Sequence, residues 1–391
     1  MQMVYLDYIA ASPLLPAAKA AMLPYLTEQF GNPQSRHGYG DAPRAAVAAA
    51  RGKVANLIGA APSEILFTAS GSEANNLAIR GVIAAGQKKG RHLITSVIEH
   101  VSVAHPMKRL AQEGYEVTWL PVDRAGRVNP NDVARAIRPD TLLVSILHAN
   151  NEIGTVQPMT EIAGITQAAD VLLHTDAVGT VGVVPFDVDQ LGVDLAGLAA
   201  PSFYGPKGVG ALYVRRGVRI APLIDGGVQE GGRRAGTENV AAIVGMGVAA
   251  EVARRQIDAD AAHFLPLRDG LIDGLLKTID RVHVTGHRVM RLPHIASFAV
   301  EYVDGEALIR RLEKRGIIAA SGSSCSADAL KISPVLTAIG FAANVAQGAI
   351  VFSMGRETTE ADITQVLFAM PECVAALRAA SPLFSRLGTA S

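Results

Sequence analysis

The sequence has 391 residues, of which 49% are hydrophobic and 18% charged, with 36 basic side chains balancing 36 acidic ones. This composition excludes a disordered or fibrous chain, and the charge balance leaves no global field that would attract nucleic acid or an anionic membrane. The two cysteines, Cys325 and Cys373, are too few for a disulfide framework or a four-cysteine metal site, and they suit a reducing cytoplasm. The expected partner is therefore a small molecule or another protein.

Neither the N-terminal residues nor the longest uncharged segment indicates an export signal or a membrane span. The first residues carry no basic segment followed by an apolar run, so no signal peptide is predicted. The longest segment without a formal charge, 332–355, is interrupted by Pro334, Gly340 and Asn344, and its end is typical of a buried strand. We therefore expect a cytoplasmic protein without a membrane span.

Short β-branched runs alternate with helical patterns through the first two thirds of the chain. Strands are predicted at 64–68, 92–95, 115–120, 141–147 and 171–175. Helices are predicted near 42–58, 73–86, 101–113, 130–138 and 159–169. The alternation indicates βαβ units, and hence an α/β fold whose mostly parallel sheet carries helices on both faces.

The pattern changes after a long helix that is predicted to begin near Thr237. Strands at 281–285, 295–300 and 349–353, with helices at 305–315 and 360–379, indicate a smaller α+β unit. The residues before Pro13 form an extended segment that we expect to pack beside this unit. We predict a large domain over 15–258 and a small domain made of 1–14 and 259–391.

Polar residues follow several predicted strands, at the sheet edge where α/β proteins bind ligands. The first strand leads through Ser70, Gly71 and Ser72 into a helix. Free N–H groups at a helix start suit a phosphate, but an ordinary serine cap explains the motif equally well. Three further clusters follow later strands, namely Glu99-His100, Asn150–Glu152 and His174–Asp176. Four clusters at the ends of strands in one sheet predict a ligand site.

A collinear series of motifs carries a family resemblance. Among them are FTASGSEANNL at 67–77, ANNEIG at 149–154, HTDA at 174–177, FYGPKG at 203–208, RAGTEN at 234–239 and SGSSCS at 321–326. The series resembles the cysteine desulfurases of the NifS and IscS type, within the class V aminotransferases, from about residue 4 to residue 370. The resemblance implies the fold-type I architecture of pyridoxal phosphate enzymes, with a mostly parallel sheet in a large domain and a smaller α+β domain.

The resemblance also implies roles for retained residues. Ser70–Ser72 would bind the cofactor phosphate, with Thr237 reaching in from the second subunit of a homodimer. His100 would stack on the pyridine ring, and Asn151 would lie beside the substrate or the ring hydroxyl. Asp176 would pair with the ring nitrogen and keep it protonated, which makes the cofactor an electron sink.

Cys325 matches the family cysteine that attacks the substrate sulfur and carries it as a persulfide. Its Ser/Gly surroundings suit a thiolate that visits first the cofactor and then a partner protein. The alternative is a small buried hydrophobic side chain. That alternative is the expectation for Cys373, which lies among Val and Ala on the predicted closing helix.

The sequence departs from the family pattern where the cofactor and substrate bind. Ser202 stands in place of the lysine that forms the Schiff base, and a serine can neither form that imine nor act as the base for the α-proton. The other departures are Pro201 for a histidine, Ala199 for a serine phosphate ligand, Gly179 for the glutamine on the ring hydroxyl, and Val351 for the arginine that clamps the substrate carboxylate. Lys207 and Lys331 are out of register to replace the missing lysine.

These features leave three hypotheses. The first is a sulfur-handling homodimer that uses Cys325 as a persulfide carrier or iron–sulfur ligand for a scaffold or thiolation partner, without ordinary desulfuration of free cysteine. The second is a desulfurase, or another lyase or transferase, that binds pyridoxal phosphate noncovalently through Ser72, His100, Asp176 and Thr237. The third is a non-enzymatic regulatory or structural paralogue in which Cys325 has no role. No other metal, nucleic acid or membrane is expected to take part.

Overall fold

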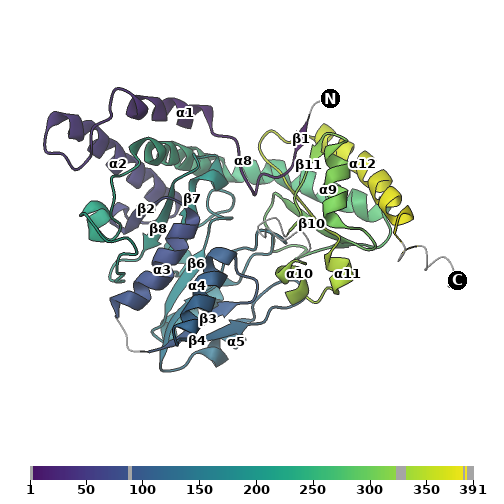
Figure 1. Ribbon diagram of the computed structural model, residues 1–391, viewed down its shortest axis with the longest axis horizontal. Helices are drawn as coiled ribbons and strands as arrows, with labels where there is room; N and C mark the ends of the chain where they lie inside the picture. The colour runs from purple at the N-terminus through teal and green to yellow at the C-terminus, as the bar shows by residue number, and fades with distance from the viewer. Residues whose placement is uncertain (1–2, 87–89, 323–331, 382–383, 385–391) are drawn as a thin grey trace.

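The computed structural model describes residues 3–86, 90–322, 332–381 and 384. A large unit built on a central sheet lies beside a smaller unit, which combines the N-terminal strand with the C-terminal elements (Figure 1). The strands are β1 Val4–Tyr5, β2 Ile65–Thr68, β3 His92–Ser96, β4 Glu116–Leu120, β5 Thr141–Ser145, β6 Leu172–Asp176, β7 Leu195–Ala199, β8 Gly210–Val214, β9 Val282–Val284, β10 Ile295–Val300, β11 Ile317–Ile318 and β12 Ala349–Ser353.

The helices agree with the predicted ones to within a few residues, and several short ones are added. They are α1 Pro16–Met22, α2 Gly38–Leu57, α3 Gly71–Ala85, α4 Val101–Gln112, α5 Pro130–Ala136, α6 Met159–Ala168, α7 Val188–Leu191, α8 Val240–Thr278, α9 Gly305–Glu313, α10 Pro334–Ala338, α11 Ala343–Ala346 and α12 Glu360–Ala379. The long helix expected near Thr237 begins at Val240, because the side chain of Asn239 caps it by accepting a hydrogen bond from the Ala242 N–H at 3.2 Å.

The central sheet has the strand order β2-β8-β7-β6-β5-β3-β4. Strand β8 runs antiparallel to both of its neighbours, and the other adjacent pairs are parallel. All strands except β8 therefore end at the same edge of the sheet. The residues that follow β2, β3, β5 and β6 meet at this edge, which is where α/β sheets bind ligands.

Two strands of this sheet, β7 and β8, escaped the sequence analysis. Strand β7 reads Leu-Ala-Gly-Leu-Ala and has no β-branched residue. Gly197 in this strand allows α3 to pack closely against the sheet, because a Cβ added at Gly197 would lie 2.0 Å from Oδ1 of Asn75 on α3. Packing of α3 against the sheet thus selects glycine here over a residue of high strand propensity.

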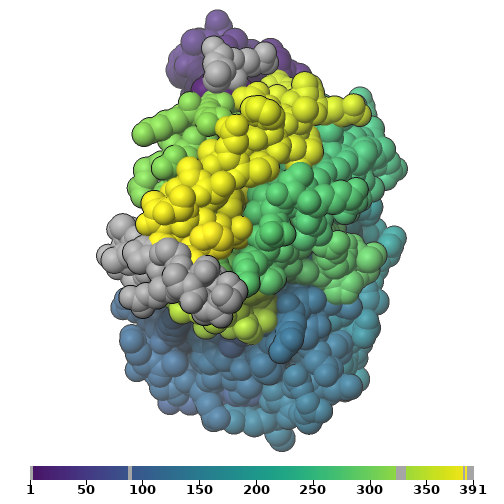
Figure 2. Space-filling view, turned by 90° about the vertical axis from the view of Figure 1, so that its right-hand side faces the viewer, coloured from purple at the N-terminus to yellow at the C-terminus, as the bar shows by residue number. Residues whose placement is uncertain are grey.

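Two large hydrophobic cores divide the molecule, and α8 contributes to both. Its first half, through Met246 and Ala250, packs into the core of the central sheet, whereas Leu271 and Leu275 belong to the core of the smaller unit. The predicted boundary between residues 258 and 259 falls between these two sets and stays a prediction. Figure 2 shows α12, in yellow, packed across α8 on the outer face of the smaller unit.

The N-terminal segment packs with the smaller unit, as the sequence indicated. Strand β1 pairs in parallel with β11, and the buried side chains of Val4 and Leu6 join the same core as Phe298. The backbone then crosses to the central sheet, since the Ser12 hydroxyl donates to the Pro201 carbonyl at 2.5 Å. Among the described residues, no helix combines the length and apolar character that a bilayer crossing needs.

Candidate functional site

A cavity of about 560 Å³ opens at the carboxyl edge of the central sheet. Eight of the residues singled out in the sequence line it, namely Ser70, Gly71, Ser72, His100, Asn151, Asp176, Gly179 and Ser202. The remaining lining residues are Asp7, Tyr8, Ile9, Ala10, Ser102, Leu147, Ala149, Val178, Val183 and His294. The N-terminal segment and His294 come from the smaller unit, so the cavity lies between the two units.

The start of α3 forms one wall of the cavity. The Ser70 hydroxyl caps the helix by accepting from the Glu73 N–H at 3.1 Å, so the capping explanation of this serine is correct. The Ser72 side chain lines the cavity and makes no hydrogen bond among the described residues. A Cβ at Gly71 would lie 2.3 Å from a methyl carbon of Val178, which explains the glycine. The positive end of the α3 dipole and a free hydroxyl thus face the cavity.

The ring of His100 is held in one orientation by its own helix start. Its Nδ1 accepts from the Ser102 N–H at 3.2 Å and lies 2.8 Å from the Ser102 hydroxyl. That hydroxyl in turn accepts from the side-chain amide of Asn75 at 2.9 Å. Since Nδ1 accepts, the proton of the neutral imidazole lies on Nε2. Ser102 and Asn75, which the sequence analysis did not select, are therefore the residues that position His100.

Asp176 ends β6 as a buried carboxylate whose oxygen accepts from the Val178 N–H at 3.0 Å. Burial raises its pKa, while the Val178 N–H, His100 and Asn75 partly offset that rise. Behind it lies Glu99, fully buried, which accepts from the Ser96 hydroxyl at 2.6 Å and the Leu147 N–H at 3.0 Å. Burial raises the pKa of Glu99 to about 8, and burial is also the main cause of the raised pKa of Asp176.

The five departures from the family pattern lie in or around the cavity. Ser202, in a 3-10 turn over Ala200–Phe203, and Gly179 line it directly, and the Ser202 side chain makes no hydrogen bond among the described residues. Ala199 packs behind Gly71, and the carbonyl of Pro201 binds Ser12. The fifth, Val351, lies on β12 in a small apolar cluster with Ala149, Leu292 and Ile295. Lys207 is exposed and outside the cavity, so it does not replace the missing lysine.

Some predicted residues are not part of this cavity. Thr237 is exposed and does not line the cavity of its own chain, so its role in a second subunit stays a prediction. Cys325 and Lys331 lie outside the described residues. Cys373 is buried on α12, as expected, and burial raises the pKa of its thiol. From the strand-end clusters, His174 is structural, with its Nδ1 2.8 Å from the Ser145 hydroxyl.

Two lining residues with unpaired polar atoms were missed. Among the described residues, Oδ1 of Asp7 and Nδ1 of His294 are buried atoms without a hydrogen-bond partner. Asp7 lies in the extended N-terminal segment that was expected to pack beside the smaller unit, but no sequence pattern indicated that its side chain reaches the cavity. His294 precedes a strand of the smaller unit, and nothing in its local sequence brings it near the sheet edge.

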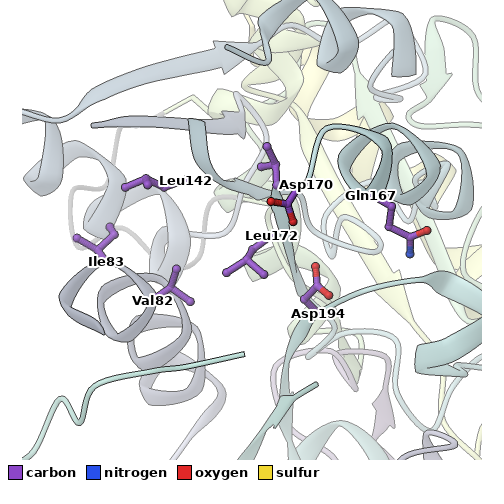
Figure 3. Close-up of a pocket in the computed structure, with 8 residues that line it drawn as sticks. Val82, Ile83, Leu142, Gln167, Asp170, Leu172 and Asp194 are labelled. Carbon is purple, nitrogen blue, oxygen red and sulfur yellow. The ribbon is translucent and has the colours of Figure 1, made fainter. Parts of the chain in front are cut away.

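A second cavity, of about 230 Å³, lies at the opposite edge of the sheet (Figure 3). Asp170 and Asp194 lie on either side of Leu172 in that view. Asp194 already accepts from the Leu173 N–H at 2.9 Å and lies 3.3 Å from Nε of Arg215. This carboxylate is thus engaged in holding the strand start, and the cavity at the carboxyl edge is the better candidate site.

The cavity fits pyridoxal phosphate, the cofactor that the resemblance implies, as a noncovalent ligand. The buried carboxylate of Asp176 suits a protonated ring nitrogen, and the fixed ring of His100 offers a stacking face. The free Ser72 hydroxyl at the α3 start suits the phosphate. The covalent contact does not fit, because Ser202 supplies a hydroxyl and no lysine lines the cavity among the described residues.

Comparison with known proteins identifies the family. The class V aminotransferase model matches residues 4–366. A cysteine desulfurase IscS of Dictyoglomus turgidum is 48% identical over 379 residues, covering 97% of this chain and 96% of that protein. A cysteine desulfurase IscS of Methanosarcina thermophila is 47% identical over 380 residues, covering 97% and 94%.

A solved structure of a NifS-like protein agrees at the level of the fold. It superposes with a TM-score of 0.90 and 36% identity, covering 96% of this chain and all of that one. This match confirms the predicted α/β architecture of fold-type I pyridoxal phosphate enzymes, with its mostly parallel central sheet. The chain therefore belongs to the class V aminotransferase family, among its proteins of the IscS and NifS type.

Proposed function

We propose that this chain is a sulfur-handling protein. Its Cys325 accepts sulfur from a persulfide donor and passes that sulfur to an iron–sulfur scaffold or a thiolation partner. One observation carries the proposal. Ser202 lies on the cavity with Asp176 and His100, and no lysine lines that cavity among the described residues. The retained SGSSCS motif and the names of the relatives, cysteine desulfurases, support sulfur as the element handled.

Ordinary desulfuration of free cysteine is not expected, for two reasons. A serine hydroxyl at position 202 cannot form an imine with an aldehyde, and its high pKa makes it a poor base. In addition, Val351 lies in an apolar cluster, and no arginine lines the cavity among the described residues. An unpaired substrate carboxylate in such surroundings costs on the order of several kcal/mol.

Sulfur transfer from a persulfide needs no added oxidant. The Cys325 thiolate attacks the outer sulfur of the donor, and a new sulfur–sulfur bond forms as the donor's own sulfur–sulfur bond breaks. The electron pair of the broken bond leaves with the donor thiolate, and the proton stays on the transferred sulfur. Cys325 then carries a persulfide, which an acceptor thiolate removes in the same way.

The residues of the cavity would hold the cofactor by noncovalent contacts alone. Pyridoxal phosphate, when bound, would supply an electron-withdrawing ring. Ser70–Ser72 would bind its phosphate, His100 and Asp176 would orient its ring, and Asn151 would lie beside the substrate. In a homodimer, Thr237 of the partner subunit would complete the phosphate side. A cytoplasmic location suits this role, since a reducing compartment keeps Cys325 and Cys373 as thiols.

The two cysteines of the chain provide a matched test. Cys325→Ala and the control Cys373→Ala are each incubated with a small-molecule persulfide and an acceptor protein. Mass spectrometry then measures the sulfur added to each protein. We expect Cys325→Ala to lose both the added sulfur and the transfer, and Cys373→Ala to keep both. Intact partner binding and full transfer in Cys325→Ala would show that the proposal is wrong.

A second candidate, an enzyme that uses noncovalently bound pyridoxal phosphate, is favoured by the hydrogen-bond chain from Asn75 through Ser102 to His100. This hydrogen-bond chain holds the imidazole ring of His100 in one orientation at the cavity wall, as a stacking contact with a cofactor ring requires. The test is the absorbance spectrum of the purified protein with and without added cofactor and L-cysteine. Cofactor absorbance without the band of a protonated lysine adduct supports this candidate, and a protein that takes up no cofactor excludes it.

A further inference from the structure

The cavity has an unusual charge for a site that belongs to an amino-acid-handling family. Two carboxylates, Asp7 and Asp176, line it, and no lysine or arginine does so among the described residues. Its two histidines are His100, whose Nδ1 is occupied, and His294. A ligand carboxylate would therefore find no cation to pair with. An ammonium group could pair with Asp7, and its charge would offset the burial that raises the pKa of this carboxyl group.

One end of the cavity is apolar, and β12 organises it. Ile9 and Ala149 line the cavity and belong to the cluster that contains Val351 of β12. Ile9 is fixed there, because its N–H donates to the Ser353 hydroxyl at 2.9 Å. Val351 is 3% exposed and lies beneath this surface. A hydrocarbon segment of a ligand can lie on this end at no desolvation cost.

The segment that begins with β12 also contacts the two missed polar residues, Asp7 and His294. Asp7 forms an isolated bridge with Ser353, and the next residue of β12's chain, Met354, donates its N–H to the His294 carbonyl at 2.9 Å. Asp7 and His294 thus contact two consecutive residues, Ser353 and Met354. Within the part of the chain that the structure describes, Oδ1 of Asp7 and Nδ1 of His294 are buried without hydrogen-bond partners, and His294 is only 7% exposed. Burial lowers the pKa of His294 to about 4, so its ring is neutral and can accept or donate one hydrogen bond.

From this arrangement we infer that the cavity binds a small aminothiol without a carboxylate, with its ammonium group at Asp7, its carbon chain on Ile9 and Ala149, and its thiol near His294. The inference rests on the proposed function, because it names the ligand class of the same cavity. Such an aminothiol differs from the amino acid cysteine by one group only. That group is the carboxylate, for which the described lining offers no cation.

Four probes separate the contributions of the two charged groups. They are L-cysteine, cysteamine, which lacks the carboxylate, 3-mercaptopropionate, which lacks the amine, and 1-propanethiol, which lacks both. Binding to the purified full-length protein is measured by isothermal titration calorimetry under reducing conditions. We expect the dissociation constant of cysteamine to be at least tenfold lower than that of L-cysteine, with 3-mercaptopropionate the weakest. Equal affinity for cysteamine and L-cysteine, or no cysteamine binding at millimolar concentration, overturns the inference.

Variants test the assignment within the cavity. Asp7→Asn should weaken cysteamine at least tenfold and leave 1-propanethiol unchanged, whereas the control Asp194→Asn, at the opposite sheet edge, should change neither. Val351→Arg should raise the affinity for L-cysteine. Because Val351 is buried and this variant can misfold, Ile9→Arg, at a half-buried lining residue, repeats the test. If neither arginine variant that folds gains affinity for the carboxylate probes, the apolar end is not the ligand's binding surface and the inference fails.

The two proposals fail separately. Sulfur transfer that still depends on Cys325, together with no preference for cysteamine, refutes the ligand class and leaves the proposed function standing. A clear preference for cysteamine, together with full transfer in Cys325→Ala, refutes the proposed function and leaves the ligand class standing.

Discussion

Replacing Asp176 with asparagine should separate cofactor binding from folding. Asp176 accepts a hydrogen bond from the Val178 N–H, and an asparagine oxygen can accept the same bond. A hydrogen bond to a charged group, such as one from a protonated ring nitrogen, contributes about 1.5–3 kcal/mol. Since 1.4 kcal/mol is about a factor of ten, Asp176→Asn should weaken pyridoxal phosphate binding by about ten- to a hundredfold.

The effect on folding has the opposite sign. Burial raises the pKa of Asp176 above its ordinary value of 3.8, so the folded protein keeps this proton to a higher pH than the unfolded chain does. The contribution of the carboxyl group to stability is full below that ordinary value and is lost as the pH rises through the raised pKa. At neutral pH and without cofactor, Asp176→Asn should therefore unfold at the same temperature as the wild type or higher.

Thermal unfolding with and without pyridoxal phosphate measures both effects. At a cofactor concentration 100 times the wild-type dissociation constant, binding adds about 2.7 kcal/mol, but only about 0.4 kcal/mol if the variant binds a hundredfold more weakly. Asp194→Asn is the control, because that half-buried carboxyl group lies at the other edge of the sheet and keeps its bond to Leu173. Equal cofactor stabilisation of Asp176→Asn and the wild type would refute the assignment of Asp176 to the ring nitrogen.

Three further predictions follow from the same structure. Ser202→Lys should give a borohydride-reducible covalent adduct with pyridoxal phosphate, detected by mass spectrometry, whereas Lys207 in the wild type should give none. Glu230→Gln should cost about 1.5–3 kcal/mol in denaturant unfolding, because it removes the charge of Glu230 from a partly buried pair with Arg51, at 2.6 and 2.7 Å. The stability of Glu99→Gln relative to the wild type should rise from about pH 4.5 to about pH 8 and then level off, since burial raises the pKa of Glu99 from 4.5 to about 8. A constant difference would contradict the burial of a titrating carboxyl group there.

The sequence predicted the fold well where a residue's local pattern and its packing agree. The strand before Ser70 and the helix after it are examples, because a β-branched run, a serine cap and an apolar stripe all favour the same boundaries. It failed at β7, where the need for a small residue against Asn75 outweighs strand propensity. No local pattern records such a contact between distant segments.

The residues of the candidate site also divide into those that a local sequence pattern predicted and those that only distant contacts bring to the cavity. Residues directly after strands, such as His100, Asn151 and Asp176, were predicted because parallel strands end at one edge. His294 could not be, since it reaches the cavity only through the pairing of β10 with β12 and the hydrogen bond from Met354. Ser102 was within reach, because a serine two residues after a histidine at a helix start can bond to its ring.

The continuity of α8 limits how this chain can be taken apart. With 39 residues at 1.5 Å each, the helix is about 58 Å long, and its two halves complete two different cores. A cut between the predicted domains would leave each piece with half a helix and an open apolar face. Neither piece is then a self-sufficient module, so exchange of one domain between relatives by recombination should yield insoluble chimaeras unless the whole of α8 travels with it.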